Sequence, residues 1–319
     1  MKFFEITKMD QDNPVLFMDY RKHTTWLSII LAIIALSSLA INKLNWGLDF
    51  TGGTLVEVSF SQPANLNQLR EVLAENSFDD AIVQSYGTQQ DVLVRIPPRE
   101  GTGLESIGEN LLNLLQKEVD PGMEIRRVEF VGPQVGDELA EAGALAILVA
   151  MLCILAYVSF RFEWRLALSA VAGLFQDVLM ILGVFSLFQI QIDLTILAAL
   201  LAVVGYSLND SIVVADRIRE NFRLLRKEDS VAVFNISISQ TMSRTLITSF
   251  TTFIVLVTLY LFGGQMIEGF AIAMMIGVVV GTYSSVFTRS TLALAMGVSR
   301  ESLMPPEVEK EGEEQDAVL

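Results

Sequence analysis

The chain has 319 residues, of which 52% are hydrophobic and 18% charged, and its mean hydropathy is +0.48. This composition is too apolar for a soluble domain and predicts several membrane spans. The formal net charge of −15 falls partly on an acidic tail over residues 291–319, which we expect to be a solvated end. This charge balance argues against a nucleic-acid partner.

Cysteine and histidine, the residues of many metal sites, are rare in this chain. The chain has one cysteine, Cys153, which lies in an apolar run, and one histidine, His23, at the entrance of a predicted helix. An intrachain disulfide is therefore impossible. The sequence contains no Walker A loop, GxGxxG motif or nucleophile–base pair, so it predicts no cofactor, no metal and no enzymatic activity.

The first membrane span is predicted over residues 24–41, after a polar N-terminus over residues 1–23. A cleaved signal peptide is the alternative. However, the apolar run is longer than the ~7–15 residues of a signal core, and no clear cleavage site follows it. We therefore expect a retained span.

Residues 42–137 are predicted to form a polar domain. Its elements are expected in this order: a glycine-rich turn (47–53), a strand (54–60), a helix capped by Asn65, two strands (81–86 and 91–96) around a turn (87–90), a helix (104–119) and a strand (123–131). The order β-α-β-β-α-β is that of a ferredoxin-like α+β domain. Nothing in this domain indicates catalysis.

A helical bundle over residues 139–290 is predicted next, which gives the chain six transmembrane helices. Each run is near the ~20 residues that a membrane helix needs. The five runs are 139–160, 166–188, 194–215, 245–262 and 266–286. The connections at 189–193 and 263–265 are interpreted as turns, and residues 216–243 as an amphipathic cytoplasmic surface segment.

Lysine and arginine in the short loops set the expected orientation. They gather in residues 1–23, 161–165 and 216–243, and none occurs in 189–193 or 263–265. The positive-inside rule places both termini in the cytoplasm and residues 42–137 on the opposite side, the periplasm of a Gram-negative cell. The basic cluster between Arg217 and Lys227 is interpreted as a contact with membrane lipids.

Asp210 is the main candidate for a functional residue. It interrupts the apolar run 194–215, and an ionisable side chain at membrane depth costs ~3 kcal/mol or more. Its expected cation is Arg244, and hydroxyls at Thr248, Ser249, Thr251 and Thr252 are candidates to hold a water chain. Protonation of Asp210 would release Arg244, which describes a two-state switch. A static ion pair is the alternative.

Two further polar residues lie inside predicted spans. Asp177, beside Gln176, is the deepest charge and is a second candidate for proton transfer, or makes a structural hydrogen bond to a Ser or Thr of a neighbouring helix. Asn209 either orients Asp210 or bonds across helices.

Small residues recur every four positions in the last predicted span. They are Gly269, Ala273, Gly277, Gly281 and Ser285, and a similar row of Ala198, Ala202 and Gly205 occurs in 194–215. The pair Gly277 and Gly281 forms a GxxxG motif, which favours close helix packing.

Five stretches of this chain resemble the SecF branch of the SecD/SecF family, within the resistance-nodulation-division superfamily. They are GLDFTGG (47–53), VGPQVG (131–136), FRFEWR (160–165), VGYSLNDSIVVADRIREN (204–221) and SRTLITSFTTF (243–253). The motif positions to which the resemblance draws attention are Gly47, Asp49, Gly52, Gly53, Gly132, Pro133 and Gly136.

The resemblance implies a protein of the bacterial inner membrane. Its implied partners are SecD, the SecYEG channel, YajC and a translocating unfolded polypeptide, and the implied role is to use the proton motive force in late stages of protein export. The family's proton-linked aspartate and arginine fall on Asp210 and Arg244. The family has His-Asp where this chain has Gln176 and Asp177, and Gln176 cannot titrate.

Two alternatives from other classes remain. A small-molecule proton antiporter of the same superfamily should carry two outer domains and about twice as many spans in one chain. A purely structural subunit predicts that Asp210→Asn has no effect.

Overall fold

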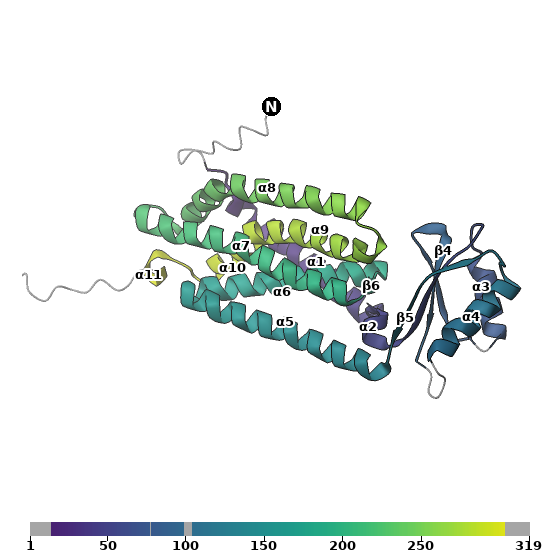
Figure 1. Ribbon diagram of the computed structural model, residues 1–319. Coiled ribbons are helices and arrows are strands. Elements are labelled where there is room, and N and C mark those ends of the chain that lie inside the picture. The colour runs from purple at the N-terminus through teal and green to yellow at the C-terminus, as the bar shows by residue number, and fades with distance from the viewer. Residues whose placement is uncertain (1–13, 77, 99–103, 304–319) are drawn as a thin grey trace, which may run out of the picture.

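The computed structural model describes residues 14–76, 78–98 and 104–303. Figure 1 shows a bundle of long helices with a sheet-containing domain at one end. In the described residues, six helices are long and apolar enough to cross a membrane. They contain α1 (Arg21–Ile41), α5 (Pro133–Arg161), α6 (Trp164–Phe188), α7 (Leu194–Leu224), α8 (Ser230–Phe262) and α9 (Glu268–Tyr283), the last continuing through a π-helix (Ser284–Thr288) into α10 (Arg289–Ala295). The predicted six spans are confirmed by length and composition.

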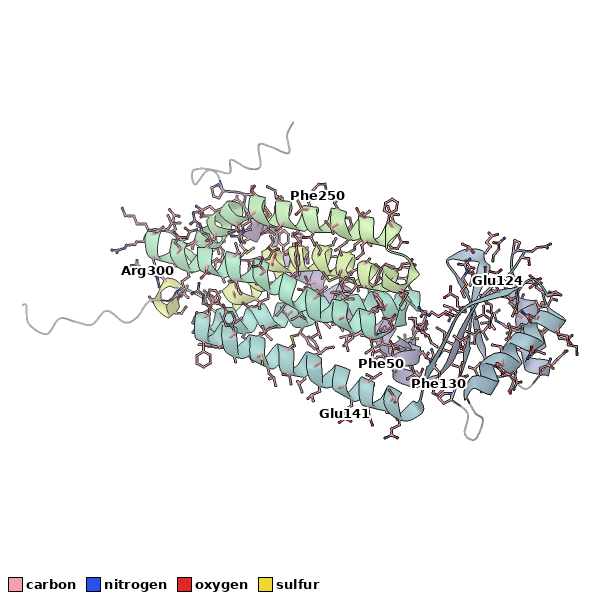
Figure 2. The ribbon with its side chains drawn as sticks, in the orientation of Figure 1. Phe50, Glu124, Phe130, Glu141, Phe250 and Arg300 are labelled. Carbon is pink, nitrogen blue, oxygen red and sulfur yellow. The ribbon has the colours of Figure 1, made fainter. Side chains whose placement is uncertain are left out.

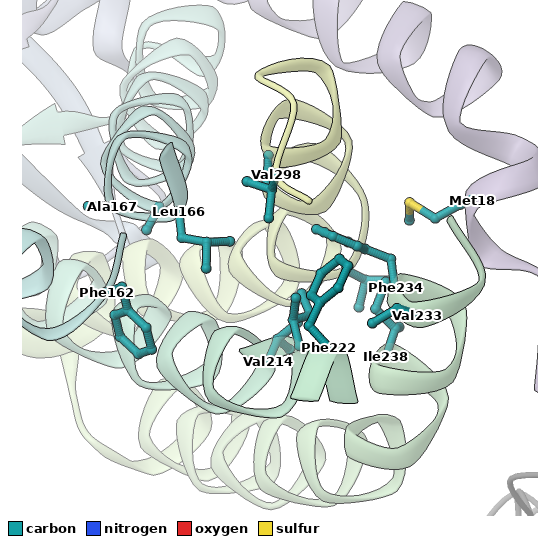
Figure 3. Packing of buried hydrophobic residues seen from close by; sticks show 14 of the residues in the cluster. Met18, Phe162, Leu166, Ala167, Val214, Phe222, Val233, Phe234, Ile238 and Val298 are labelled. Atoms are coloured by element: carbon teal, nitrogen blue, oxygen red, sulfur yellow. The ribbon is translucent and has the colours of Figure 1, made fainter. Parts of the chain in front are cut away.

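Residues 216–243 do not form the predicted separate surface segment. Instead, α7 continues to Leu224 and α8 begins at Ser230, where the Asp229 carboxylate accepts a hydrogen bond from the amide of Ala232. Figure 3 shows that apolar residues of this segment, among them Phe222, Val233 and Phe234, belong to one buried cluster that also includes Met18. Phe222 and Phe234 meet edge to face at 6.2 Å. The prediction was wrong because the charged residues mark only the ends of the apolar runs 194–215 and 245–262. The helices α7 and α8 themselves extend beyond these runs.

The domain contains β2 (Gly53–Ser59), α3 (Leu66–Glu75), β3 (Ile82–Tyr86), β4 (Thr88–Ile96), α4 (Leu104–Glu118) and β5 (Glu124–Val131). The predicted succession of strands and helices is present. The strands form an antiparallel sheet in the order β3-β4-β2-β5. Apolar side chains from the sheet, α3 and α4 form one core, which includes Val56, Val94, Leu69 and Leu111.

The tight connection between β3 and β4 corrects the turn predicted over residues 87–90. Tyr86 pairs with Thr88, and β4 already begins at Thr88. The register shifts at this point, since the preceding Ser85 pairs with Val92, and Gly87 lies at the reversal with φ of 70°, in the left-handed region that glycine adopts without steric cost.

Both glycine-rich motifs lie where the domain meets the bundle, and each contains more than a turn. The first includes a short helix, α2 (Leu48–Thr51), after β1 (Asn45–Trp46). Strand β1 pairs in parallel with β6 (Gln191–Ile192). Residues 189–193, which were predicted as a turn, therefore also contain a short strand. Two-residue strands are too short to show a period in the sequence.

These motifs attach the domain to α7. The backbone amide of Gly47 donates to the carbonyl of Ile192 at 2.7 Å. The amide of Leu194, the first residue of α7, donates to Asp49 Oδ2 at 2.9 Å. In the second motif, a Cβ on Gly136 would lie 3.0 Å from the amide nitrogen of Gly52, so glycine allows α5 to approach α2. This junction, which lies near Phe50 and Phe130 in Figure 2, therefore connects the domain to α7, the helix that carries Asp210.

Candidate functional site: a buried charged centre

Asp177 lies near the middle of α6 and is fully buried. Its Oδ2 forms an ion pair with Arg289 Nη2 at 2.5 Å. The hydroxyl of Ser207, on α7, donates to the same carboxylate oxygen at 2.6 Å. The structural hydrogen bond considered for Asp177 is thus formed, and it occurs together with an ion pair that sequence reasoning missed.

Arg289 is enclosed among three helices and is only 4% exposed. Its Nη2 also donates to Ser207 Oγ at 2.6 Å, and its Nη1 donates to the Ser207 carbonyl at 2.8 Å and to the Ser211 hydroxyl. A Cβ at Gly173 of α6 would overlap the Arg289 side chain, so glycine provides the space for it. Such a set of donors and acceptors is what a buried charge requires.

A π-helix ends at Thr288, immediately before Arg289. Single π turns inside α-helices are frequent at functional sites. The sequence did carry a signal for Arg289, because it follows Ser285 at the same four-residue spacing as the small residues. We missed it because the predicted span ended at residue 286.

Asp210 lies on α7 between Ser207 and Ser211, and it is 5% exposed. Within the described part of the chain, its Oδ2 has no hydrogen-bond partner. Arg289 acts on it electrostatically, and Arg244 acts more weakly.

The expected ion pair between Asp210 and Arg244 is not formed. Arg244 is exposed on α8, and the ion pairs within 4.0 Å among the described residues do not include it. The cation paired with Asp177 is Arg289, near the end of the sequence, and it also acts on Asp210 more strongly than Arg244 does. Pairing across the bundle depends on which helix face each residue occupies, which charge spacing alone did not reveal.

The other candidates of this region are divided between the interior and the surface. Asn209 is exposed, and among the described residues it makes no hydrogen bond to the carboxylate of Asp210. Ser249 is buried and shares a hydrogen bond of 2.7 Å with Thr282. Thr248 and Thr251 donate to carbonyls of their own helix, so they do not form a chain of hydroxyls toward Asp210.

The small-residue stripe of α9 lies against α7. A Cβ on Gly277 would overlap Val203, and one on Gly281 would lie 2.8 Å from Ser207 Oγ. This is the close helix approach that the spacing predicts. The row of Ala198, Ala202 and Gly205, in contrast, faces outward, on the same exposed side of α7 as Asn209.

A small cavity of about 30 Å³ adjoins the charged centre. Its polar lining consists of Arg289 and the hydroxyl-bearing residues Ser169, Ser211, Ser285 and Ser290. A water molecule needs ~10–15 Å³ measured in this way, so the cavity has room for about two. Among the described residues, no group of three or more His, Cys, Asp or Glu is arranged to hold a metal ion.

Comparison with known proteins assigns the family. The model of the family described as "Protein export membrane protein SecD/SecF, C-terminal" matches residues 112–299, and that of the "SecD/SecF GG Motif" matches residues 37–64. The protein translocase subunit SecF of Vibrio alginolyticus is 52% identical over 98% of this chain and 99% of its own length. That of Escherichia coli O157:H7 is 47% identical over 94% of each.

The fold agrees with a solved relative. The crystal structure of SecDF, a translocon-associated membrane protein from Thermus thermophilus, superposes with a TM-score of 0.81 at 34% identity over 90% of this chain. The chain covers 39% of that protein's length. It is therefore a multi-span membrane protein, and it belongs to the SecD/SecF family, among the SecF subunits of the protein translocase.

Proposed function

We propose that this chain is a subunit of the bacterial Sec machinery that uses the proton motive force to promote late stages of protein export. Its relatives along nearly the whole chain are named protein translocase subunits. The proton role is supported by one observation above all: Asp210 is buried in a membrane-length helix, and one of its carboxylate oxygens has no hydrogen-bond partner among the described residues. Intramembrane carboxylates of this kind mark proton paths.

A partner subunit is part of the proposal. Because this chain corresponds to 39% of the solved SecDF chain, the remainder would be supplied by a SecD-type protein. The outward row of Ala198, Ala202 and Gly205 on α7 is suited to close contact with a helix of that partner. We further propose contact with SecYEG and YajC, and an inner-membrane location with both termini cytoplasmic and the α+β domain in the periplasm.

The coupling would be conformational rather than covalent. One elementary charge crossing the membrane releases ~2.3 kcal/mol per 100 mV of potential. A change of charge at Asp210 would be passed along α7 to the junction at Asp49, and from there to the domain that holds or releases the emerging polypeptide. Arg244 would act as a second, exposed cation of this path.

The test is export into inverted membrane vesicles by wild type, Asp210→Asn and Arg244→Met, with and without a collapsed proton gradient. At matched protein levels, both variants should assemble but lose the gradient-dependent part of export. If Asp210→Asn exports as well as wild type under a full gradient, the subunit is structural and the proton role is wrong.

A further inference from the structure

The buried centre contains an unequal number of opposite charges. Asp177, Asp210 and Arg289 are each at least 95% buried, and they come from α6, α7 and α10. An arginine guanidinium does not lose its proton in proteins. With both carboxylates ionised, the centre would have a net charge of −1, which is costly away from water. One bound proton makes it neutral.

The hydrogen bonds indicate which carboxyl group holds that proton. Asp177 Oδ2 accepts from Arg289 and from Ser207, as a carboxylate does. Asp177 Oδ1 and Asp210 Oδ2 both accept from no group in the described residues, but Asp177 differs in having a guanidinium and a hydroxyl on its other oxygen. The remaining charged group that acts on Asp210 is Arg244 of α8, which is exposed and therefore not part of the buried balance.

We propose that Arg289 is the counter-cation that turns this centre into a site for a single proton, with Asp177 ionised and Asp210 protonated. The inference rests on the proposed function and identifies the residues that set the proton count. When Asp210 releases its proton, the centre holds a second carboxylate and still only one guanidinium. Arg289 Nε, which lies against Gly173 of α6, makes no hydrogen bond in the described structure, so the guanidinium has one donor that is not in use.

The same step would couple three helices. Arg289 is bonded to Asp177 of α6 and to Ser207 and Ser211 of α7, on either side of Asp210. A shift of its guanidinium from Asp177 toward an ionised Asp210 would therefore loosen α6 from α10 and tighten α10 onto α7. Gly173 leaves the space in which this side chain lies, and Gly281 leaves the space for its partner Ser207.

The test counts protonated carboxyl groups by infrared spectroscopy of the purified chain in lipid vesicles at neutral pH, where solvated Asp and Glu are ionised. Wild type should show one such group, and Asp210→Asn none. Asp177→Asn should also show none, because Arg289 then compensates Asp210. Arg289→Gln should show two.

Two further variants make the test decisive. The double variant Asp177→Asn with Arg289→Gln removes the ion pair as a unit and should show one protonated group even if Arg289→Gln does not fold. Arg244→Gln is the matched control, and its count should stay at one. The proposal is overturned if Asp177→Asn keeps the wild-type band, or if Arg244→Gln changes the count.

Because the spectrum is recorded without export, it separates this inference from the proposed function. The predicted counts together with normal export by Asp210→Asn would mean that the site binds a proton but does not drive transport. Loss of export in Asp210→Asn with an unchanged count in Asp177→Asn would retain the proposed function and reject the role of Arg289.

Discussion

The inner and outer helices of the bundle have similar hydropathy but very different surroundings. In each inner helix, namely α6, α7 and the helix from α9 to α10, 50% of the most apolar stretch is buried inside the protein. In the outer helices this buried share is 11% for α5 and 17% for α1 and α8. All three members of the charged centre come from the inner group. The outer helices, such as α8 with Phe250 in Figure 2, present large apolar side chains to their surroundings.

This difference shows what holds each part together. Lipid tails are as apolar as leucine, so burial of apolar surface gives little drive for helix association in a membrane. Close packing and polar bonds between α6, α7, α9 and α10 must supply it. We therefore expect the outer helices to tolerate substitution better than the inner ones, unless a partner chain covers them.

Arg289→Leu should cause the largest loss, roughly 3–5 kcal/mol, because Asp177 loses its buried cation and can stay buried only by taking up a proton. The measurement is unfolding in lipid–detergent micelles with increasing dodecyl sulfate. The double variant Asp177→Leu with Arg289→Leu should recover most of that loss. Equal losses in the single and double variants would contradict the account.

A pair of leucine substitutions compares the two groups of helices directly. Leu174 on α6 is fully buried, whereas Leu152 on α5 is 55% exposed. We expect Leu174→Ala to cost about 2 kcal/mol or more through the cavity it leaves, and Leu152→Ala less than about 0.5 kcal/mol. The same unfolding assay applies. A large loss for Leu152→Ala in the isolated chain would mean that α5 is not an outer helix.

Asp49→Ala should weaken the junction between the domain and α7. The variant removes the acceptor for the amide of Leu194, a loss typical of a helix cap, ~1 kcal/mol. Hydrogen exchange should increase at the start of α7 and in α2. Glu141→Ala, an exposed acidic residue on α5, is the control and should leave both segments unchanged.

The smallest effect is expected in the domain, at Asp91 of β4. The hydroxyls of Thr88 and then of Ser59 hold the pKa of this carboxyl below its usual value of about 3.9. The ionised form therefore stabilises the folded domain above about pH 4, and that contribution is lost as pH falls through the lower folded pKa.

Asp91→Asn should accordingly weaken protection of the sheet amides at neutral pH, by less than about 1 kcal/mol. The difference from wild type should shrink as the pH is lowered below about 4. Hydrogen exchange of β4, compared between the two proteins at each pH, measures it. A difference that grows on acidification would have the wrong sign.

The sequence predicted the elements but not their pairing. The six spans and the succession of strands and helices in the domain follow from apolar length and periodicity, which are local properties. The parallel pair of β1 and β6 joins residues 45–46 to 191–192, and two residues show no period. Asp177 and Asp210 were identified by the cost of burying charge, whereas Arg289 lay outside the predicted span.

The candidate pair Asp210 and Arg244 illustrates this limit. Asp210 lies in the expected helix 194–215 and Arg244 immediately before the expected helix 245–262, but the helix phase turns Arg244 outward and Asp210 inward. The extent of α7 and α8 was similarly underestimated, because the helices continue where hydropathy falls. Such features depend on the assembled bundle.

Proton movement during export tests the central claim most directly. The subunit would be reconstituted with its SecD-type partner and the translocation channel in vesicles that contain a pH-sensitive dye and carry a proton gradient. Adding a translocating substrate should accelerate proton flux in wild type, and Asp210→Asn should abolish this acceleration. Equal substrate-dependent flux in the Asp210→Asn variant would contradict the claim that this buried carboxyl carries the proton.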